Sequence, residues 1–202
     1  PEVFTWIHLL TPHRPYLPPA KYIKRLPKEQ RAKLSALYDA EIRATDDMIG
    51  RITAAIKKYV GLENALIVFT SDHGEEFWEH NEEEHGHSLH REVVHVPLIF
   101  TSPRLRAGKT IDHYTGTIDI MPTLLKIANI AVPPKKVEGT DLLQLMSDEK
   151  PVAPGYFIFA EGMLYGPTER SFTWNNYKLI FDKQNKKCRL YNLKNDPGEM
   201  ND

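Results

Sequence analysis

The sequence predicts an α/β fold, in which a mostly parallel sheet flanked by helices is followed by a small antiparallel sheet. Apolar, strand-like runs lie at residues 3–10, 65–71 and 96–100, and a long helical pattern at residues 27–60 separates the first two. A strand, a helix and a strand in this order predict a βαβ unit, whose strands pair in parallel through a right-handed crossover. After Pro151 the pattern changes to short strand candidates separated by turns, which predicts the antiparallel sheet.

The change of pattern near residue 150 divides the chain of 202 residues into two expected parts. Residues 1–150 are expected to form the α/β layer, and residues 151–202 the small sheet. The strand candidates of the second part lie at residues 156–160, 170–174, 177–181 and 189–193. Because only short turns separate them, they predict an antiparallel meander.

Within residues 27–60, apolar side chains recur mostly at steps of three and four residues, which is the pattern of an amphipathic helix. They are Leu34, Leu37, Tyr38, Ile42, Met48, Ile49, Ile52 and Ile56. Gly61 follows and is expected to end the helix. Adjacent helix positions point about 100° apart, so at most one of Asp46 and Asp47 is expected to face inward.

Shorter elements follow the strand at residues 65–71. An acidic loop spans residues 75–84, and its aromatic side chains Phe77 and Trp78 are expected to point inward. The other candidates of the first part are a short helix at residues 89–94, the strand at 96–100, a helix at 119–129, a linker that begins at Pro133 and a short helix at 141–146.

Composition excludes several classes of protein. A formal net charge of -1 and a pI near 6.9 argue against a nucleic-acid binder, so a small-molecule partner is expected. No apolar run approaches the roughly 20 residues that cross a bilayer. The single cysteine, Cys188, excludes an internal disulfide and a cysteine-rich zinc site. Compartment and oligomeric state are left open by these totals.

The apolar run at residues 65–71 ends abruptly in Asp72, His73 and Gly74. Ligands of open α/β sheets bind outside the carboxyl ends of the strands, so this point is a candidate active site. A carboxylate and an imidazole are both good ligands for a divalent metal, and the glycine lets the backbone turn sharply behind them. The alternative is that Asp72 caps a following helix and His73 is an ordinary loop residue.

Histidines are concentrated in one region, since five of the nine lie between His80 and His95. Imidazole binds metals and anions, so this density suggests a functional cluster, and the alternative is a solvated, acidic and histidine-rich loop. Another candidate, His13, lies at residues 11–19 in a loop stiffened by four prolines, which hold the side chain in a defined place. The alternative for His13 is a turn residue without a chemical role.

Five motifs in a fixed order give the chain a resemblance to the C-terminal half of sulfatases, which belong to the alkaline phosphatase superfamily. They are Pro-His-Arg-Pro-Tyr at residues 12–16, Thr-Ser-Asp-His-Gly-Glu at 70–75, the histidine-rich segment at 85–100, Ile-Asp-Ile-Met-Pro-Thr-Leu-Leu at 118–125 and Tyr-Asn-Leu-Lys-Asn-Asp-Pro-Gly-Glu at 191–199. The resemblance covers nearly the whole chain. It implies that residues 1–150 are the C-terminal portion of an alkaline phosphatase-like core, in an enzyme that hydrolyses small-molecule sulfate esters.

The resemblance also implies roles for individual residues. Asp72 and His73 match two metal ligands, His13 matches a histidine that contacts the sulfate, and His85 matches a lysine or histidine that binds the same group. His87 takes the last role if the register is shifted. Imidazoles at His13 and His85 would stabilise charge on the transferring group and protonate the leaving oxygen.

The implied cofactor is a divalent metal, and calcium is the ion that the family resemblance favours. Manganese, magnesium and zinc stay open, because His73 supplies a nitrogen where many relatives have asparagine.

The sequence departs from the family at its nucleophile, a formylglycine made from the first residue of a Cys/Ser-x-Pro-x-Arg motif. Cys188 lacks the rest of that motif, and residues 102–104, Ser-Pro-Arg, have the wrong spacing. We therefore expect the formylglycine and further metal ligands to lie outside this chain, in a longer enzyme. The chain by itself is expected to be inactive.

Two other functions stay open. Residues 71–75 suit a phosphodiester or phosphonate hydrolase, or a phosphoethanolamine transferase, of the same superfamily, although residues 196–199 favour a sulfatase. A non-catalytic, sulfatase-like domain is the other alternative. An upstream Cys/Ser-x-Pro-x-Arg motif would favour the enzyme over this domain.

Overall fold

The computed structural model describes residues 3–131, 136–146, 156–162, 164–166 and 168–202. The chain forms two compact units, Pro1–Ala65 and Leu66–Asp202, and each is described by itself. The boundary expected near residue 150 lies outside the described residues, so the division into residues 1–150 and 151–202 stays a prediction.

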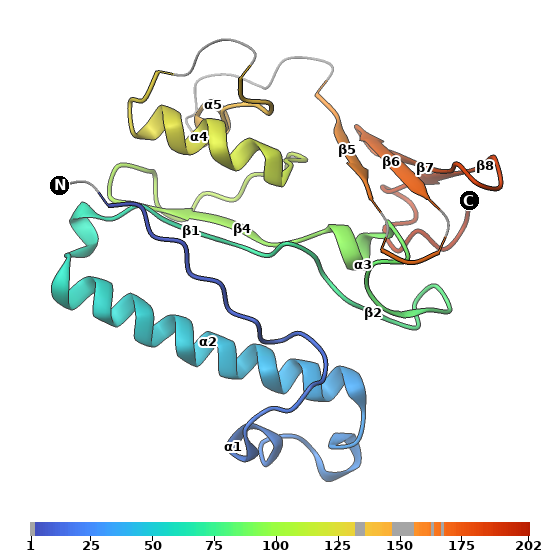
Figure 1. Cartoon of the computed structure of the whole chain (residues 1–202), viewed down its shortest axis with the longest axis horizontal. Coiled ribbons are helices and arrows are strands. Elements are labelled where there is room, and N and C mark those ends of the chain that lie inside the picture. The colour runs from blue at the N-terminus through green and yellow to red at the C-terminus, as the bar shows by residue number, and fades with distance from the viewer. Residues whose placement is uncertain (1–2, 132–135, 147–155, 163, 167) are drawn as a thin grey trace. The chain divides into compact units, whose positions relative to one another are not determined.

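The first unit is helical (Figure 1). Its elements are α1 (Ala20–Ile23), a 3₁₀ turn η1 (Lys28–Gln30), the long helix α2 (Leu34–Tyr59) and a 3₁₀ turn η2 (Leu62–Asn64). Helix α2 begins later than the periodicity predicted, because the chain before it forms turns in which the Arg31 side chain donates to the carbonyls of Lys24 and Leu26. It ends as predicted at Gly61, which has a φ of 82° and donates its amide to Ile56.

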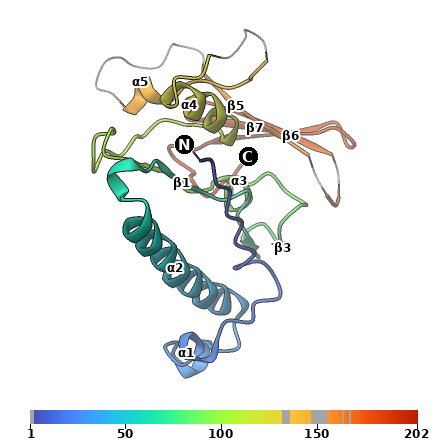
Figure 2. The same cartoon turned by 60° about the vertical axis from the view of Figure 1, so that its left-hand side comes forward.

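The segment before α2 runs beside that helix (Figure 2), and polar contacts join the two. The Leu17 amide donates to Glu41 Oε1 at 2.7 Å, and the Tyr22 hydroxyl donates to Asp47 Oδ2 at 2.6 Å. The hydrogen bond from Tyr22, reinforced by Lys21, lowers the pKa of Asp47. Asp47 is therefore the member of the predicted aspartate pair that contacts another element.

Residues 3–10 do not form a strand, which corrects the sequence prediction. Most of their apolar side chains are exposed, including Phe4 and Trp6. A strand needs a neighbour that accepts its backbone hydrogen bonds, and the described part of the first unit contains helices and loops. The parallel pair expected between residues 3–10 and 65–71 is therefore not found among the described residues.

The second unit begins with β1 (Ile67–Thr70), which pairs with β4 (Leu98–Thr101) in antiparallel register. Both strands were predicted from their apolar runs, but their antiparallel pairing differs from the mostly parallel sheet that the sequence predicted. The segment between them contains a hairpin and a short helix and returns the chain to the end at which β1 finished, so β4 runs the opposite way (Figure 1). Every strand pair among the described residues is antiparallel.

The acidic loop forms a short hairpin of β2 (Glu76–Phe77) and β3 (Glu83–Glu84). Trp78 lies in its turn with a φ of 74° and is exposed, which corrects the expectation that it points inward. Phe77 is half-buried, as its place in β2 allows.

The helices predicted in the second unit are present with shorter bounds. They are α3 (Arg91–Val94), α4 (Ile120–Ile127), preceded by a 3₁₀ turn η3 (Thr117–Asp119), and α5 (Leu143–Met146). Buried Asp119 links these elements, because it accepts hydrogen bonds from the amides of Gly116 and Thr140 and from the Tyr156 hydroxyl. The linker predicted to begin at Pro133 lies outside the described residues. None of the helices in the described part combines the length and apolarity that crossing a membrane requires.

The C-terminal sheet is an antiparallel meander, as predicted. Its strands lie in the order β5 (Ile158–Glu161), β6 (Glu169–Trp174), β7 (Tyr177–Asp182) and β8 (Lys187–Asn192). A two-residue turn with Asn175 at a φ of 51° joins β6 to β7, a position that asparagine tolerates well. One face of the sheet buries polar side chains such as Ser171 and Lys178, and the other exposes Phe172 and Trp174.

Gly74 lets the end of β1 approach α3 closely. Its amide donates to the Val93 carbonyl at 2.7 Å, and a Cβ at this position would lie 2.0 Å from the Glu92 carbonyl oxygen. Gly74 has no positive φ, so close approach, rather than the sharp turn inferred from the sequence, requires the glycine.

Replacing Gly74 with alanine should therefore destabilise the protein. We expect Gly74→Ala to lower the free energy of unfolding of the full-length protein by about 1–3 kcal/mol, because the new methyl group meets backbone. Gly50→Ala is the matched control, since its added Cβ meets nothing within 4 Å on an exposed part of α2. That change should stabilise by about 0.5–1 kcal/mol. Urea unfolding measures both, and equal effects of the two substitutions would contradict the role of Gly74.

Candidate active site

Asp72 and His73 lie directly after β1, where local hydrogen bonds shape the backbone. Ser71 Oγ donates to the His73 carbonyl at 2.7 Å, and the His73 amide donates to Asp72 Oδ1 at 3.1 Å. The next element is strand β2, so Asp72 does not cap a helix, and that part of the alternative is wrong. The turn places Asp72 Oδ2 3.9 Å from His73 Nε2.

These two side chains fit the requirements of a metal site. His73 Nδ1 lies 2.8 Å from the Gly74 carbonyl, which only accepts, so Nδ1 carries the hydrogen and the neutral ring has its lone pair on Nε2. Two atoms that each lie about 2.0–2.6 Å from one ion are at most about 4–5 Å apart, and the 3.9 Å separation of Oδ2 and Nε2 meets this limit. The Asp72 side chain is 72% exposed, so ligands from other segments can reach it.

His85, which directly follows β3, joins the same cluster. Its ring stacks on that of His73, with centroids 3.8 Å apart and planes inclined by 22°. In the hairpin register Glu76 faces Glu84, so the next pair outward is Glu75 and His85. His85 Nδ1 lies 2.8 Å from Glu75 Oε1 and donates to it, which sets the orientation and the tautomer of the ring.

His87 belongs to a different cluster. Its Nε2 lies 2.9 Å from Oε2 of Glu76, which also accepts a hydrogen bond from Ser88 Oγ at 2.5 Å. The neighbouring carboxylates Glu75 and Glu76 thus bond to two different histidines, His85 and His87. The structure therefore brings Asp72, His73 and His85 together and gives His87 a separate partner.

His13 lies in the first unit, in the proline-rich loop. Its Nδ1 is 2.7 Å from the Arg14 carbonyl, and this contact sets the tautomer of the ring. Its expected contact with the sulfate stays a prediction.

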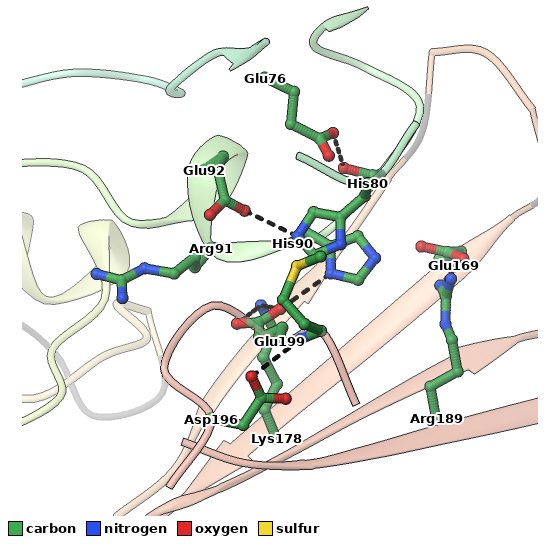
Figure 3. A network of polar contacts seen from close by, with 12 residues as sticks. Glu76, His80, His90, Arg91, Glu92, Glu169, Lys178, Arg189, Asp196 and Glu199 are labelled. Atoms are coloured by element: carbon green, nitrogen blue, oxygen red, sulfur yellow. Dashed lines mark hydrogen bonds and ion pairs between the residues drawn. The ribbon is translucent and has the colours of Figure 1, made fainter. Parts of the chain in front are cut away.

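Figure 3 shows a buried ion pair, between Lys178 and Glu199, that no pattern in the sequence predicted. Lys178 Nζ on β7 lies 2.8 and 2.9 Å from the two carboxylate oxygens of Glu199, and His90 Nδ1 lies 3.1 Å from Glu199 Oε2. The side chains of Lys178 and Glu199 are 3% and 1% exposed. This pair ties the C-terminal segment and the meander to His90, directly before α3.

The two charges of this pair respond differently to burial. Burial lowers the pKa of Lys178, against the opposing effect of the Glu199 carboxylate. Burial alone would raise the pKa of Glu199, but the hydrogen bond from His90 and the charge of Lys178 outweigh it, so the pKa is lowered. The Glu199 carboxylate is therefore ionised in the folded protein at neutral pH.

The sequence did not predict the carboxylate partners of His85 and His90, for two different reasons. Glu75 and His85 are ten residues apart and face each other across a hairpin, so the hairpin register would have revealed their pairing had the turn been located. His90 and Glu199 are 109 residues apart, and no local pattern signals their contact.

Family models place the chain in one class of protein. A model described as Sulfatase matches residues 2–130, and one described as N-sulphoglucosamine sulphohydrolase, C-terminal, matches residues 83–202. The chain belongs to the sulfatase family. Its fold is the α/β, alkaline phosphatase-like fold of that family with a C-terminal four-stranded antiparallel sheet, as the sequence predicted.

Curated relatives include two proteins named arylsulfatase K. The protein of Mus musculus is 37% identical over 115 residues, which are 57% of this chain and 20% of the relative. That of Xenopus laevis is 30% identical over 178 residues, which are 83% of this chain and 33% of the relative. The chain thus spans at most about a third of the length of these curated relatives.

Solved structures of similar fold include a protein in complex with its substrate D-glucosamine-2-N,6-O-disulfate. It has a TM-score of 0.72 and 26% identity over 84% of this chain and 36% of its own. The phosphonate monoester hydrolase of Silicibacter pomeroyi also has a TM-score of 0.72, at 24% identity, over 84% of this chain and 36% of its own. The latter similarity concerns the fold alone.

Removing one partner of the buried ion pair should destabilise the protein. We expect Glu199→Gln to cost the full-length protein about 3–5 kcal/mol at pH 7, because Lys178 is left buried without its counter-charge. Glu161→Gln is the control, since it removes an ion pair whose side chains are about half exposed, Arg170 50% and Glu161 51%, and should cost at most about 1 kcal/mol.

The same pair predicts a pH dependence. The pKa of Glu199 is lowered from its ordinary value of 4.5, so its contribution to stability is complete above that value and is lost as the pH falls through the lower, folded-state value. Urea unfolding between pH 7 and pH 3 should show a smaller loss of stability on acidification in Glu199→Gln than in the wild type. Parallel curves for the two proteins would contradict the assignment.

Proposed function

We propose that this chain is part of a sulfatase that hydrolyses a small-molecule sulfate ester with the help of a divalent metal ion. Residues 1–150 would be the C-terminal portion of its α/β core, and residues 151–202 a small sheet subdomain. The observation that carries the proposal is the cluster at the end of β1, where Asp72, His73 and His85 meet. Membership of the sulfatase family supports it.

Asp72 and His73 are the proposed metal ligands. A bound divalent ion supplies a Lewis acid that polarises an oxygen of the sulfate group. Asp72 provides an anionic oxygen, and the Nδ1 hydrogen bond of His73 to Gly74 presents its Nε2 as the ligand atom. Calcium is the proposed ion. Manganese, magnesium and zinc are the alternatives, and of these zinc is the ion that an imidazole nitrogen suits best.

His85 and His13 are the proposed sulfate contacts. A protonated imidazole donates hydrogen bonds to the sulfate oxygens as their charge increases, and passes a proton to the leaving alcohol oxygen when the ester bond breaks. Nδ1 of His85 is hydrogen-bonded to Glu75, so the other ring nitrogen, Nε2, is the proposed atom for the sulfate contacts. His87 takes the role of His85 only if the family motif matches this segment in a shifted register.

The proposed nucleophile is a formylglycine on a part of the enzyme outside this chain. Cys188 does not replace it, because the residues after this cysteine do not form a Cys-x-Pro-x-Arg motif. The structural neighbour bound to D-glucosamine-2-N,6-O-disulfate makes a sulfated sugar the first substrate class to assay.

Loss of the metal ligand should abolish turnover. In the full-length protein, we expect Asp72→Asn to reduce aryl sulfate hydrolysis by at least about 10², because the polarising ion loses an anionic ligand. Asp46→Asn, on the exposed surface of α2, is the matched control and should keep wild-type rates. Unchanged turnover in Asp72→Asn would reject the metal role.

Loss of either proposed sulfate contact, His13 or His85, should lower the rate of sulfate ester hydrolysis to a similar extent. His13→Ala and His85→Ala are each expected to reduce kcat by about 10² or more, as loss of a general acid or an oxyanion contact does. His95→Ala, an exposed histidine of the same region, should be neutral. Wild-type kcat in either variant would remove that residue from the site, and a loss in His87→Ala instead of His85→Ala would indicate the shifted register.

The purified chain of 202 residues should not hydrolyse an aryl sulfate. Measurable turnover by the isolated chain would mean that it contains the nucleophile. Parallel assays of the full-length protein with an aryl phosphonate and a phosphodiester separate the sulfatase from the alternative hydrolases, and activity on neither these nor sulfate esters would favour a non-catalytic domain.

A further inference from the structure

We propose that Glu76, His80 and Glu92 form a second divalent-metal site, which takes Zn²⁺ and is distinct from the proposed site at Asp72 and His73. The three side chains come from the hairpin and from α3, and Figure 3 shows them pointing toward one another. The proposal does not depend on sulfate chemistry, because it rests on a separate set of residues.

The ligand atoms are close enough to share one ion. One atom from each of the three residues lies within 4.8 Å of the others, and His80 Nε2 is 3.2 Å from Glu92 Oε2. Atoms bound to Zn²⁺ at about 2.0–2.2 Å lie about 3–4 Å from one another, so a small inward rotation of the glutamate side chains completes the geometry.

A buried, unpaired carboxylate oxygen points independently to a ligand. The Glu76 side chain is 0% exposed, and its Oε1 has no hydrogen-bond partner among the described residues. Its other oxygen, Oε2, accepts hydrogen bonds from His87 and Ser88. An anionic oxygen that is removed from water without a partner is costly, and a cation beside it compensates that cost.

Neighbouring residues hold the proposed ligands in place. The His80 ring stacks on His90 with centroids 3.6 Å apart and planes inclined by 9°, and His90 is itself hydrogen-bonded to Glu199. Glu92 lies on α3, which packs closely against Gly74. Supporting contacts of this kind orient ligands before the metal arrives.

The chemistry of the three side chains favours zinc. One imidazole nitrogen and two carboxylate oxygens are ligands that Zn²⁺ accepts, and three protein ligands leave a fourth position for water. The side chains of His80 and Glu92 are 11% and 18% exposed, so solvent reaches the edge of the cluster. Glu75 bonds to His85 of the first cluster and Glu76 bonds to His87, so the two proposed metal sites use separate residues.

The test measures zinc content instead of activity. The full-length protein without an affinity tag, carrying Asp72→Asn to disable the first site, is stripped with a chelator, dialysed against Zn²⁺ alone and assayed by mass spectrometry for bound metal. We expect one Zn²⁺ that is lost, or bound at least about 10-fold more weakly, when Glu92→Gln or Glu76→Gln is added. Glu82→Gln, an exposed glutamate of the same hairpin, is the matched control and should keep the ion.

Thermal unfolding shows whether a variant loses zinc because it fails to fold. Zn²⁺ should raise the Tm of the Asp72→Asn protein by several degrees and leave that of Asp72→Asn/Glu92→Gln unchanged, while both unfold cooperatively without metal. Equal zinc content and equal Tm shifts in the Glu92→Gln and Glu82→Gln proteins would overturn the proposal and identify the cluster as a hydrogen-bonded network. Because the first site is disabled in every sample, this result is independent of whether Asp72 binds a metal.

Discussion

The second unit depends on one buried carboxylate, that of Glu199. Lys178 of the C-terminal meander and His90 before α3 both bind it, so a single charge connects three segments that are far apart in the chain. Burial of a lysine and a glutamate without such partners would oppose folding. The ion pair therefore allows the meander to present a polar face to the segment that carries the candidate active site.

Neighbouring residues at the start of the hairpin of β2 and β3 contribute to two different side-chain clusters. Glu75, directly before β2, bonds to His85, and Glu76, the first residue of β2, bonds to His87. The first cluster stacks on His73 and contributes to the proposed sulfate pocket. The second meets His80 and Glu92 and holds the unpaired oxygen that suggests a further cation.

Close packing at Gly74 connects these clusters to the sheet. Without a side chain, residue 74 donates its amide to Val93 and lets α3 lie against the end of β1. The metal ligands proposed after β1 and the carboxylate of Glu92 on α3 therefore depend on the same contact. The family resemblance is the basis for proposing Asp72 and His73 as ligands, and the packing explains how the fold holds the backbone that follows them.

The sequence by itself determined the α/β class, the long helix α2, the four strands of the meander and the candidate residues Asp72, His73 and His85. Periodicity and turn residues are local signals, and each reports what one segment buries. Only the tertiary structure decided that β4 runs antiparallel to β1, that residues 3–10 form no strand, that Glu75 holds His85 of the site, and that Glu199 holds His90. These outcomes depend on which segments meet after the chain closes upon itself, and for a contact between residues 109 positions apart no local pattern carries that information.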